Sequence, residues 1–181
     1  MRAEKIQESV VLPQGVSATG ENHTLTIKGP KGEVKRVLFH PKVALEVAPT
    51  TITLTAVKPN KEIKMVLYTL LAHARNMVQG AAQGFTYKLK ICYVHFPMTV
   101  KVEGSTVVIS NFLGEKIPRK SRILENVKVK VEGEIIVVEG ADLEKVSQTA
   151  ANIEMTTRIT RRDRRRFQDG CYIIEKAGVP V

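Results

Sequence analysis

The sequence predicts an α+β protein made of two tandem, similar domains that arose by internal duplication. Short stretches of the first half recur in the second half, in the same order and at offsets that drift from 82 to 86 residues. A duplicated unit decides the architecture, so this repeat is the first feature to establish. The matched pairs are Thr24–Ile27 with Thr106–Ile109, Ile52–Leu54 with Ile136–Val138, and Gly84-Phe85 with Gly170-Cys171.

The first copy contains β-rich runs separated by Gly, Pro and Asn turns, followed by one amphipathic helix. Apolar residues recur at steps of three and four from Ile63 to Met77, which indicates a helix with one face toward a core. Asn60 is placed to cap its N-terminus, and Gly80 marks its end. The expected strands are Val16–Ala18, Leu25–Lys28, Val34–Phe39, Val43–Val47 and Thr51–Ala56.

The second copy repeats this order of elements. A shorter helical stripe runs from Leu143 to Ile153, with Asp142 as the expected N-cap and an end near Thr156 and Thr157. The expected strands are Met98–Val102, Val107–Ser110, Val127–Val131, Ile135–Glu139 and Tyr172–Glu175.

Short turns between neighbouring strands predict mostly antiparallel sheets, and one helix per copy is too little to cover both faces of a sheet. We therefore expect an N-terminal α+β repeat over residues 1–84 and a C-terminal α+β repeat over residues 85–181. The apolar run Phe85–Phe96 is expected to close the first sheet and to lead into the second domain.

The charge of the chain favours a phosphate-rich partner. It has 28 Lys and Arg against 18 Asp and Glu among 181 residues, which gives a net charge of +10 and a pI near 9.7. These values favour nucleic acid over an anionic membrane as the partner. The N-terminus lacks the apolar region of a signal peptide, and charges interrupt every long apolar stretch. We expect an intracellular protein with no membrane segment.

Residue types that carry out catalysis are present, but not in catalytic patterns. The four histidines are scattered, and Cys92 and Cys171 lie far apart in strand-like settings that fit reduced core thiols. The segment Gly29–Gly32 lacks phosphate-loop spacing and is expected to be a hairpin turn between strands. The prediction is therefore a protein with no enzymatic activity, no cofactor, no metal site and no small-molecule substrate.

Basic residues gather in two places in the second half. One set lies between the helix and the last strand and comprises Arg158, Arg161, Arg162, Arg164, Arg165 and Arg166. A second set follows the turn Asn111–Glu115, at the tip or return of a hairpin, and comprises Lys116, Arg119, Lys120 and Arg122. An arginine run can also be a solvated loop or a localisation signal. Structured elements on both sides favour a phosphate-binding face, because arginine makes bidentate bonds to phosphate.

The kind of nucleic acid follows from what the sequence lacks. It shows no base-reading helix and no aromatic strand of the kind that stacks single-stranded RNA, and aromatic residues make up 5% of the chain. The expected ligand is therefore a structured RNA, recognised by shape through its phosphates and 2′-hydroxyls.

Four strings carry a resemblance to a known family. They are KGPKG from Lys28 to Gly32, YVHFP from Tyr93 to Pro97, NFLGEK from Asn111 to Lys116, and FQDGCYI from Phe167 to Ile173. From about Val11 to Lys176 the chain resembles the large-subunit ribosomal proteins of the L-six family, and their archaeal and eukaryotic branch most closely. Relatives mix Lys, Asp and Ile where this chain has RRDRRRF, and an aliphatic residue is common where it has Cys171.

This resemblance implies a cytoplasmic structural protein of the large ribosomal subunit that binds large-subunit ribosomal RNA mainly through its C-terminal domain. It implies a place near the base of the acidic stalk and the factor-binding region, beside neighbouring ribosomal proteins. Carried over by position, NFLGEK implicates Lys116 and Arg119, and the segment before FQDG implicates Arg161, Arg162, Arg164 and Arg166. The alternative is a basic protein-interaction module that docks acidic stalk or translation-factor partners.

Overall fold

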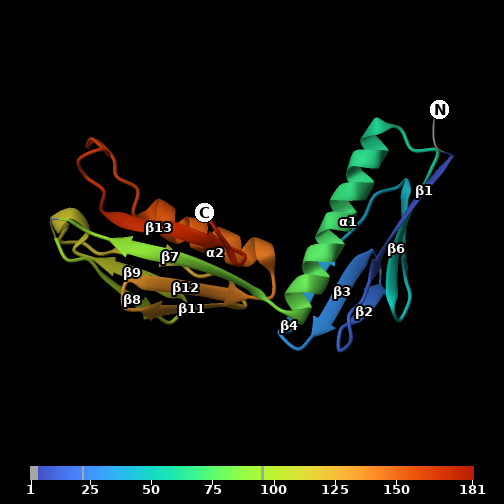
Figure 1. Ribbon diagram of the computed structural model, residues 1–181, viewed down its shortest axis with the longest axis horizontal. Coiled ribbons are helices and arrows are strands. Elements are labelled where there is room, and N and C mark those ends of the chain that lie inside the picture. Colours follow the sequence, from blue (N-terminus) through green and yellow to red (C-terminus); the bar gives the residue numbers. More distant parts are fainter. Residues whose placement is uncertain (1–3, 22, 95) are drawn as a thin grey trace. The chain divides into compact units, whose positions relative to one another are not determined.

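The computed structural model describes residues 4–21, 23–94 and 96–181, and the chain divides into two compact units, Met1–Gly84 and Phe85–Val181 (Figure 1). Each unit has one long helix packed on antiparallel strands, so the predicted α+β class with two similar repeats is confirmed. The first unit contains β1 (Lys5–Val11), β2 (Ser17–Glu21), β3 (Thr24–Gly29), β4 (Gly32–Val37), β5 (Val43–Val47), β6 (Thr51–Val57) and α1 (Lys61–Ala82).

The second unit repeats this series and adds to it. Its elements are β7 (Phe85–Cys92), β8 (Thr99–Glu103), β9 (Thr106–Ser110), the 3₁₀ turn η1 (Phe112–Gly114), β10 (Arg119–Arg122), β11 (Val127–Glu132), β12 (Ile135–Gly140), α2 (Leu143–Thr156), β13 (Gly170–Lys176) and β14 (Val179–Pro180). The ten strand runs expected from the sequence all overlap these strands, and all but one agree with their bounds to within two residues. The exception is Val16–Ala18, which ends three residues before β2 does. Three strands, β1, β10 and β14, were not expected.

The two units share a strand order. In the first unit the sheets run β1-β6-β5 and β2-β3-β4; in the second they run β11-β12-β7-β13-β14 and β10-β9-β8. The strand β7 pairs with β12 as β1 pairs with β6, so β7 is the opening strand of the second repeat. The expectation that Phe85–Phe96 closes the first sheet is therefore wrong. Every second residue of β7 is buried, so β7 is a core strand. A pattern of this kind does not determine with which strands β7 pairs.

Both helices begin at the predicted caps. The Asn60 side chain accepts a hydrogen bond from the Ile63 N–H at 2.8 Å, and the Asp142 side chain accepts one from the Glu144 N–H at 2.9 Å. These bonds satisfy N–H groups that the first turn of a helix leaves without intrahelical partners. The core of the second unit lies between α2 and the inner faces of its strands, where Leu89, Ile136 and Ile153 are fully buried.

In the first unit the β3–β4 hairpin packs against the C-terminal end of α1. The N–H of Lys31, in the two-residue turn, donates to the Ala81 carbonyl at 3.1 Å, a group that α1 itself leaves unsatisfied. A Cβ atom on Gly29 would lie 2.4 Å from the same carbonyl oxygen, so only glycine fits there. The Gly29–Gly32 segment is thus the predicted hairpin turn, and Gly29 allows the turn to pack closely against the end of α1.

Gly29→Ala is expected to destabilise the protein by about 1–3 kcal/mol, because the added methyl group must push the hairpin off the end of α1. Chemical denaturation measures the change. Thr19→Ala, on the exposed side of β2, is the control and should stay within about 0.5 kcal/mol. Equal, small effects of both substitutions would show that the hairpin does not depend on this contact.

Candidate nucleic-acid interface

The segment of residues 157–169, between α2 and β13, holds six arginines and is called the arginine loop below. One acidic residue organises its backbone. The carboxylate of Asp163 accepts a hydrogen bond from the backbone N–H of Arg165 at 3.0 Å. The backbone carbonyl of Asp163 accepts hydrogen bonds from the N–H groups of Arg166 and Phe167 at 3.1 and 3.0 Å. The hydrogen bond from the Arg165 guanidinium lowers the pKa of Asp163, so this carboxyl stays ionised at neutral pH. The loop is therefore a folded turn despite its charge.

Both ends of the arginine loop are fixed in the second unit. At the start, the Thr157 hydroxyl donates to the Glu154 carbonyl at 3.0 Å and accepts the Cys171 N–H at 2.9 Å, and Ile159 is buried in the core. At the far end, Asp169 is 2% exposed, and its carboxylate accepts the Val94 N–H. Gly170 follows with a φ of 151°, and a Cβ there would lie 3.3 Å from the Thr157 hydroxyl. The arginines between these ends are held on a scaffold.

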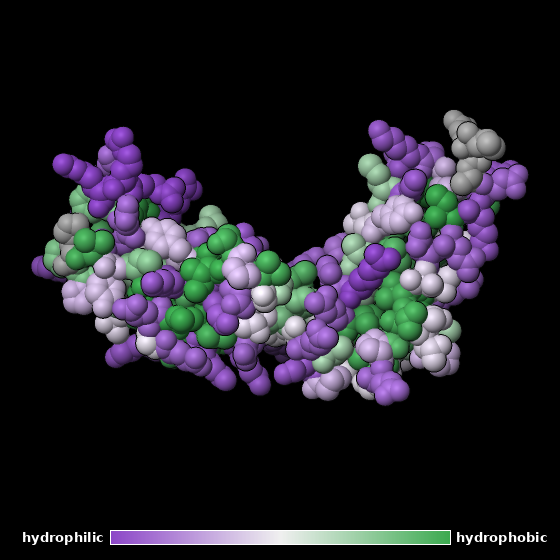
Figure 2. All heavy atoms as spheres, viewed as in Figure 1, coloured by the Kyte–Doolittle hydropathy of each residue, from purple (hydrophilic) through white to green (hydrophobic). Residues whose placement is uncertain are grey.

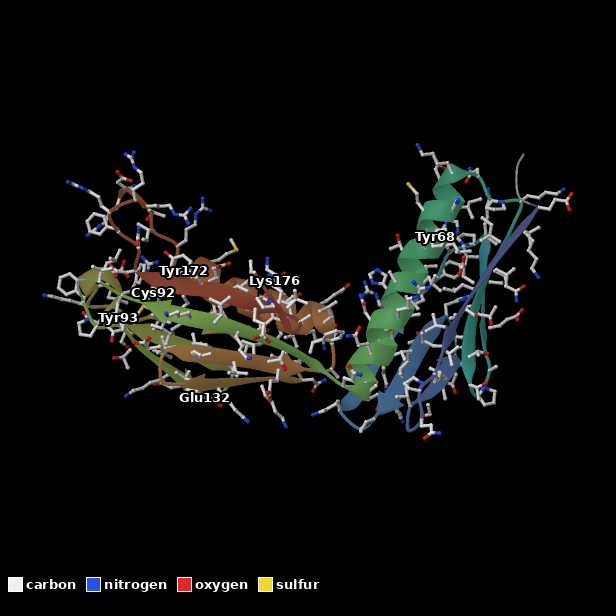
Figure 3. All side chains as sticks on the ribbon, viewed as in Figure 1. Tyr68, Cys92, Tyr93, Glu132, Tyr172 and Lys176 are labelled. Carbon is white, nitrogen blue, oxygen red and sulfur yellow. The ribbon has the colours of Figure 1, made fainter. Side chains whose placement is uncertain are left out.

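The arginines of the arginine loop are exposed to solvent. Arg158, Arg161, Arg162, Arg164, Arg165 and Arg166 are all exposed residues. Figure 2 shows hydrophilic side chains gathered over the loop, and Figure 3 shows nitrogen-tipped side chains that project from it. Arg162 lies over the Phe167 ring at 4.8 Å, and Arg165 is paired with Asp163 yet has a side chain 91% exposed. This is a surface of high positive charge in a defined conformation.

The second basic set is divided by the structure. Along β10, Arg119 and Ser121 alternate with Lys120 and Arg122, and the first two are the less exposed. Alternate residues of a strand point to opposite faces, so Lys120 and Arg122 point to the opposite side from Arg119. Lys116 is exposed on the turn before β10. The sequence grouped these four residues together, whereas the structure distributes them over a turn and two faces of a strand.

Arg119 has contacts that the sequence did not predict. Its Nε and Nη2 donate to the two carboxylate oxygens of Glu115 at 2.8 and 2.6 Å. Its Nη1 donates to the carbonyls of Thr156 and Arg158 at 2.8 and 3.2 Å. The guanidinium also lies 4.2 Å from the centre of the buried Phe112 ring. We expected Arg119 to contact RNA, but the structure gives its guanidinium to partners inside the protein.

These contacts bring the two basic segments together. Arg119 ties the turn after β9 to the last residue of α2 and to the first arginine of the arginine loop. The hydrogen bond from Arg119 is also the main reason that the pKa of Glu115 is lowered, and the charge of Arg162 contributes. The candidate interface therefore consists of two segments that are far apart in sequence and joined by one arginine.

The second unit also contains a hollow and a buried thiol. A hollow of about 600 Å³ lies at the end of β7 and is lined by Lys90, Cys92, Tyr93, Glu134, Gln168 and Tyr172, three of which are labelled in Figure 3. Burial raises the pKa of the Cys171 thiol to about 12, which makes it unreactive at neutral pH.

The described residues show neither a cluster of metal ligands nor a membrane-spanning helix. They contain no group of three or more His, Cys, Asp or Glu side chains that could hold a metal ion. None of the helices in the described part of the chain has the length and apolar character of a membrane span.

Comparison with known proteins places the chain in a family. The family described as Ribosomal protein L6 matches residues 12–84 and 96–170, one segment in each unit. Three archaeal proteins, each named large ribosomal subunit protein uL6, are similar over nearly their whole length. The protein of Methanosarcina mazei is 47% identical over 96% of this chain and 99% of its own. That of Sulfurisphaera tokodaii is 43% identical over 97% and 95%, and that of Aeropyrum pernix 44% over 94% and 94%. The chain therefore belongs to the ribosomal protein L6 family.

Proposed function

We propose that this protein is a non-enzymatic, structural constituent of the cytoplasmic large ribosomal subunit and supports translation by binding large-subunit ribosomal RNA. Membership of the ribosomal protein L6 family supports the ribosomal role. The proposed RNA contacts are the arginine loop together with Lys116, Lys120 and Arg122. We further propose that the protein lies near the stalk base and the factor-binding region, beside neighbouring ribosomal proteins.

The observation that carries the RNA-binding proposal is the arginine loop, whose arginines are exposed while both ends are held in the folded unit. Phosphates are the main source of affinity for RNA-binding surfaces, and each one neutralised releases counterions. A loop that is already folded loses less conformational entropy on binding than a disordered basic tail of the same charge. The loop therefore provides both strong attraction to phosphates and a fixed arrangement that can match one RNA shape.

Binding to structured RNA fragments over a salt series tests this function. The probes are overlapping fragments of Methanosarcina mazei large-subunit ribosomal RNA, and the control is an unrelated duplex RNA of equal length. One fragment is expected to bind better than the control, and this preference should persist at high salt, because shape-specific contacts are less screened than general charge attraction. Equal and steeply salt-dependent binding to all probes would contradict the proposal and favour docking to an acidic protein.

A further inference from the structure

We propose that Arg119 is a positioning residue of the RNA interface: it fixes the start of the arginine loop and does not itself contact RNA. This inference rests on the proposed function, because it assigns a role within the same interface. It changes the role expected for Arg119, which the NFLGEK motif had grouped with the phosphate-binding residues.

The first argument is that the guanidinium of Arg119 has few donors left for a ligand. An arginine side chain carries five N–H groups, and four of those in Arg119 already donate to the Glu115 carboxylate and to the carbonyls of Thr156 and Arg158. One face of the guanidinium is occupied by the Phe112 ring, and the side chain is 26% exposed. A phosphate would have to break these bonds to be bound in the bidentate manner typical of arginine.

The second argument is electrostatic. The carboxylate of Glu115 neutralises Arg119 in a bidentate ion pair, so this arginine adds little net charge to the surface. The remaining partial negative charge near the guanidinium comes from the C-terminal end of α2, whose last carbonyl groups have no intrahelical donors. Arg119 lies at the C-terminal end of α2, where a positive charge stabilises the helix. This stabilisation accounts for a positive charge at position 119 without any contact to RNA.

The third argument comes from the first repeat. There the hairpin between the third and fourth strands, β3–β4, satisfies the Ala81 carbonyl in the last turn of α1 through the Lys31 backbone N–H. The corresponding hairpin of the second unit, β9–β10, satisfies the Thr156 carbonyl of α2 through the Arg119 side chain. Hairpin-to-helix contact is thus part of the repeated fold. The second unit makes it with a long side chain and extends it to the Arg158 carbonyl, where the arginine loop begins.

The consequence is a separation of roles between arginines of the same interface. The loop arginines supply charge to the RNA, whereas Arg119 determines how the start of their loop is held relative to α2 and the turn after β9. Without Arg119 the loop would keep all its charges but would sample more conformations. Binding would then lose affinity through added conformational entropy, without losing a phosphate contact.

The test uses the double variant Glu115→Gln with Arg119→Gln in the full-length protein, because it removes the ion pair without changing the net charge. The comparison is Arg164→Gln, which removes one exposed loop charge. Binding to the preferred ribosomal RNA fragment is measured over a salt series. We expect the double variant to bind about 5- to 20-fold more weakly with an unchanged salt slope. Arg164→Gln should reduce the slope by about one phosphate contact.

A second readout needs no RNA. Trypsin cleaves after arginine and lysine, so the cleavage rate between residues 158 and 166 reports how often the loop opens. The double variant should be cut faster in this loop than the native protein, with little change in cleavage after Lys128 on β11. Arg119→Lys keeps the charge but loses the planar fork, so it should also speed cleavage and weaken binding with an unchanged slope.

Three results would overturn the positioning role: a reduced salt slope in the double variant, native binding by Arg119→Lys, or loop cleavage at the native rate. The first two would make Arg119 a phosphate contact. Failure of the proposed function looks different. If Arg164→Gln and the double variant both leave ribosomal RNA binding unchanged while trypsin cuts the double variant faster in the loop, then Arg119 orders the loop but the loop does not bind RNA.

Discussion

Replacing Arg161, Arg162 and Arg164 together with glutamine is expected to weaken binding to the preferred ribosomal RNA fragment by about 100-fold near 0.1 M salt. Each exposed arginine–phosphate contact is expected to contribute about 1 kcal/mol, somewhat below the range for hydrogen bonds to charged groups, and three such losses amount to about two orders of magnitude in affinity. The salt slope should fall by between two and three units, since each lost phosphate contact changes it by about one.

The matched control for this triple variant is Lys128→Gln, Lys130→Gln and Lys176→Gln, which removes the same charge from exposed positions on β11 and β13. Lys128 and Lys176 lie toward the opposite end of the sheet from Gly170, where the arginine loop joins β13. Figure 3 labels Lys176 at that end. The control should change the salt slope little. Thermal stability should also change little in both variants, because these are surface residues. An unchanged slope in the arginine variant would exclude this loop as the RNA-binding face.

Truncating a buried side chain on either helix is expected to have the largest effect on stability. Leu67 on α1 and Ile153 on α2 have no exposed surface, and Ile153 packs among the strands of the second unit. Leu67→Ala and Ile153→Ala should each lower the free energy of unfolding by about 2–5 kcal/mol, because removal of buried methyl groups leaves a cavity in a packed core. Denaturation curves for the two variants measure the change.

The controls for the core variants are methionines on the same helices. Met65 on α1 and Met155 on α2 are 58% and 64% exposed, so Met65→Ala and Met155→Ala remove a similar side chain from the solvent face. Their effects should stay within about 0.5 kcal/mol. Equal effects of a core variant and its control would show that the helix does not pack as described. Ile153→Ala has a further expected consequence, because α2 ends where the arginine loop begins: loop cleavage by trypsin should accelerate.

Local patterns in the sequence were sufficient to predict much of the fold. The steps of three and four that define α1 and α2, and the caps Asn60 and Asp142, depend on residues within a few positions of one another. The strand runs of both repeats and the hairpin at Gly29–Gly32 follow from alternation and turn residues in the same way. The strands missed were β1, β10 and β14. Of these, β10 is rich in exposed charge and β14 is very short, so neither carries a clear apolar pattern.

The candidate interface was only partly predictable. The arginine run and its flanking elements are visible in the sequence, because their residues are contiguous. The role of Asp163 as the organiser of the loop could have been suspected, since Asp commonly bonds to the backbone two residues further on. The carbonyl partners of Arg119 could not, because Thr156 and Arg158 lie more than thirty residues away along the chain.

Local patterns in the sequence are enough to establish two α+β repeats, the residues at which their helices begin, and a run of arginines between α2 and the last core strand. These features depend on local periodicity, capping and composition. Three features became visible only in the folded chain: β7 opens the second unit, Lys120 and Arg122 point to the opposite side from Arg119, and Arg119 joins the β9–β10 hairpin to the arginine loop. The reason is that strand pairing and side-chain partners are chosen by packing between residues distant in sequence, and no local pattern records that choice.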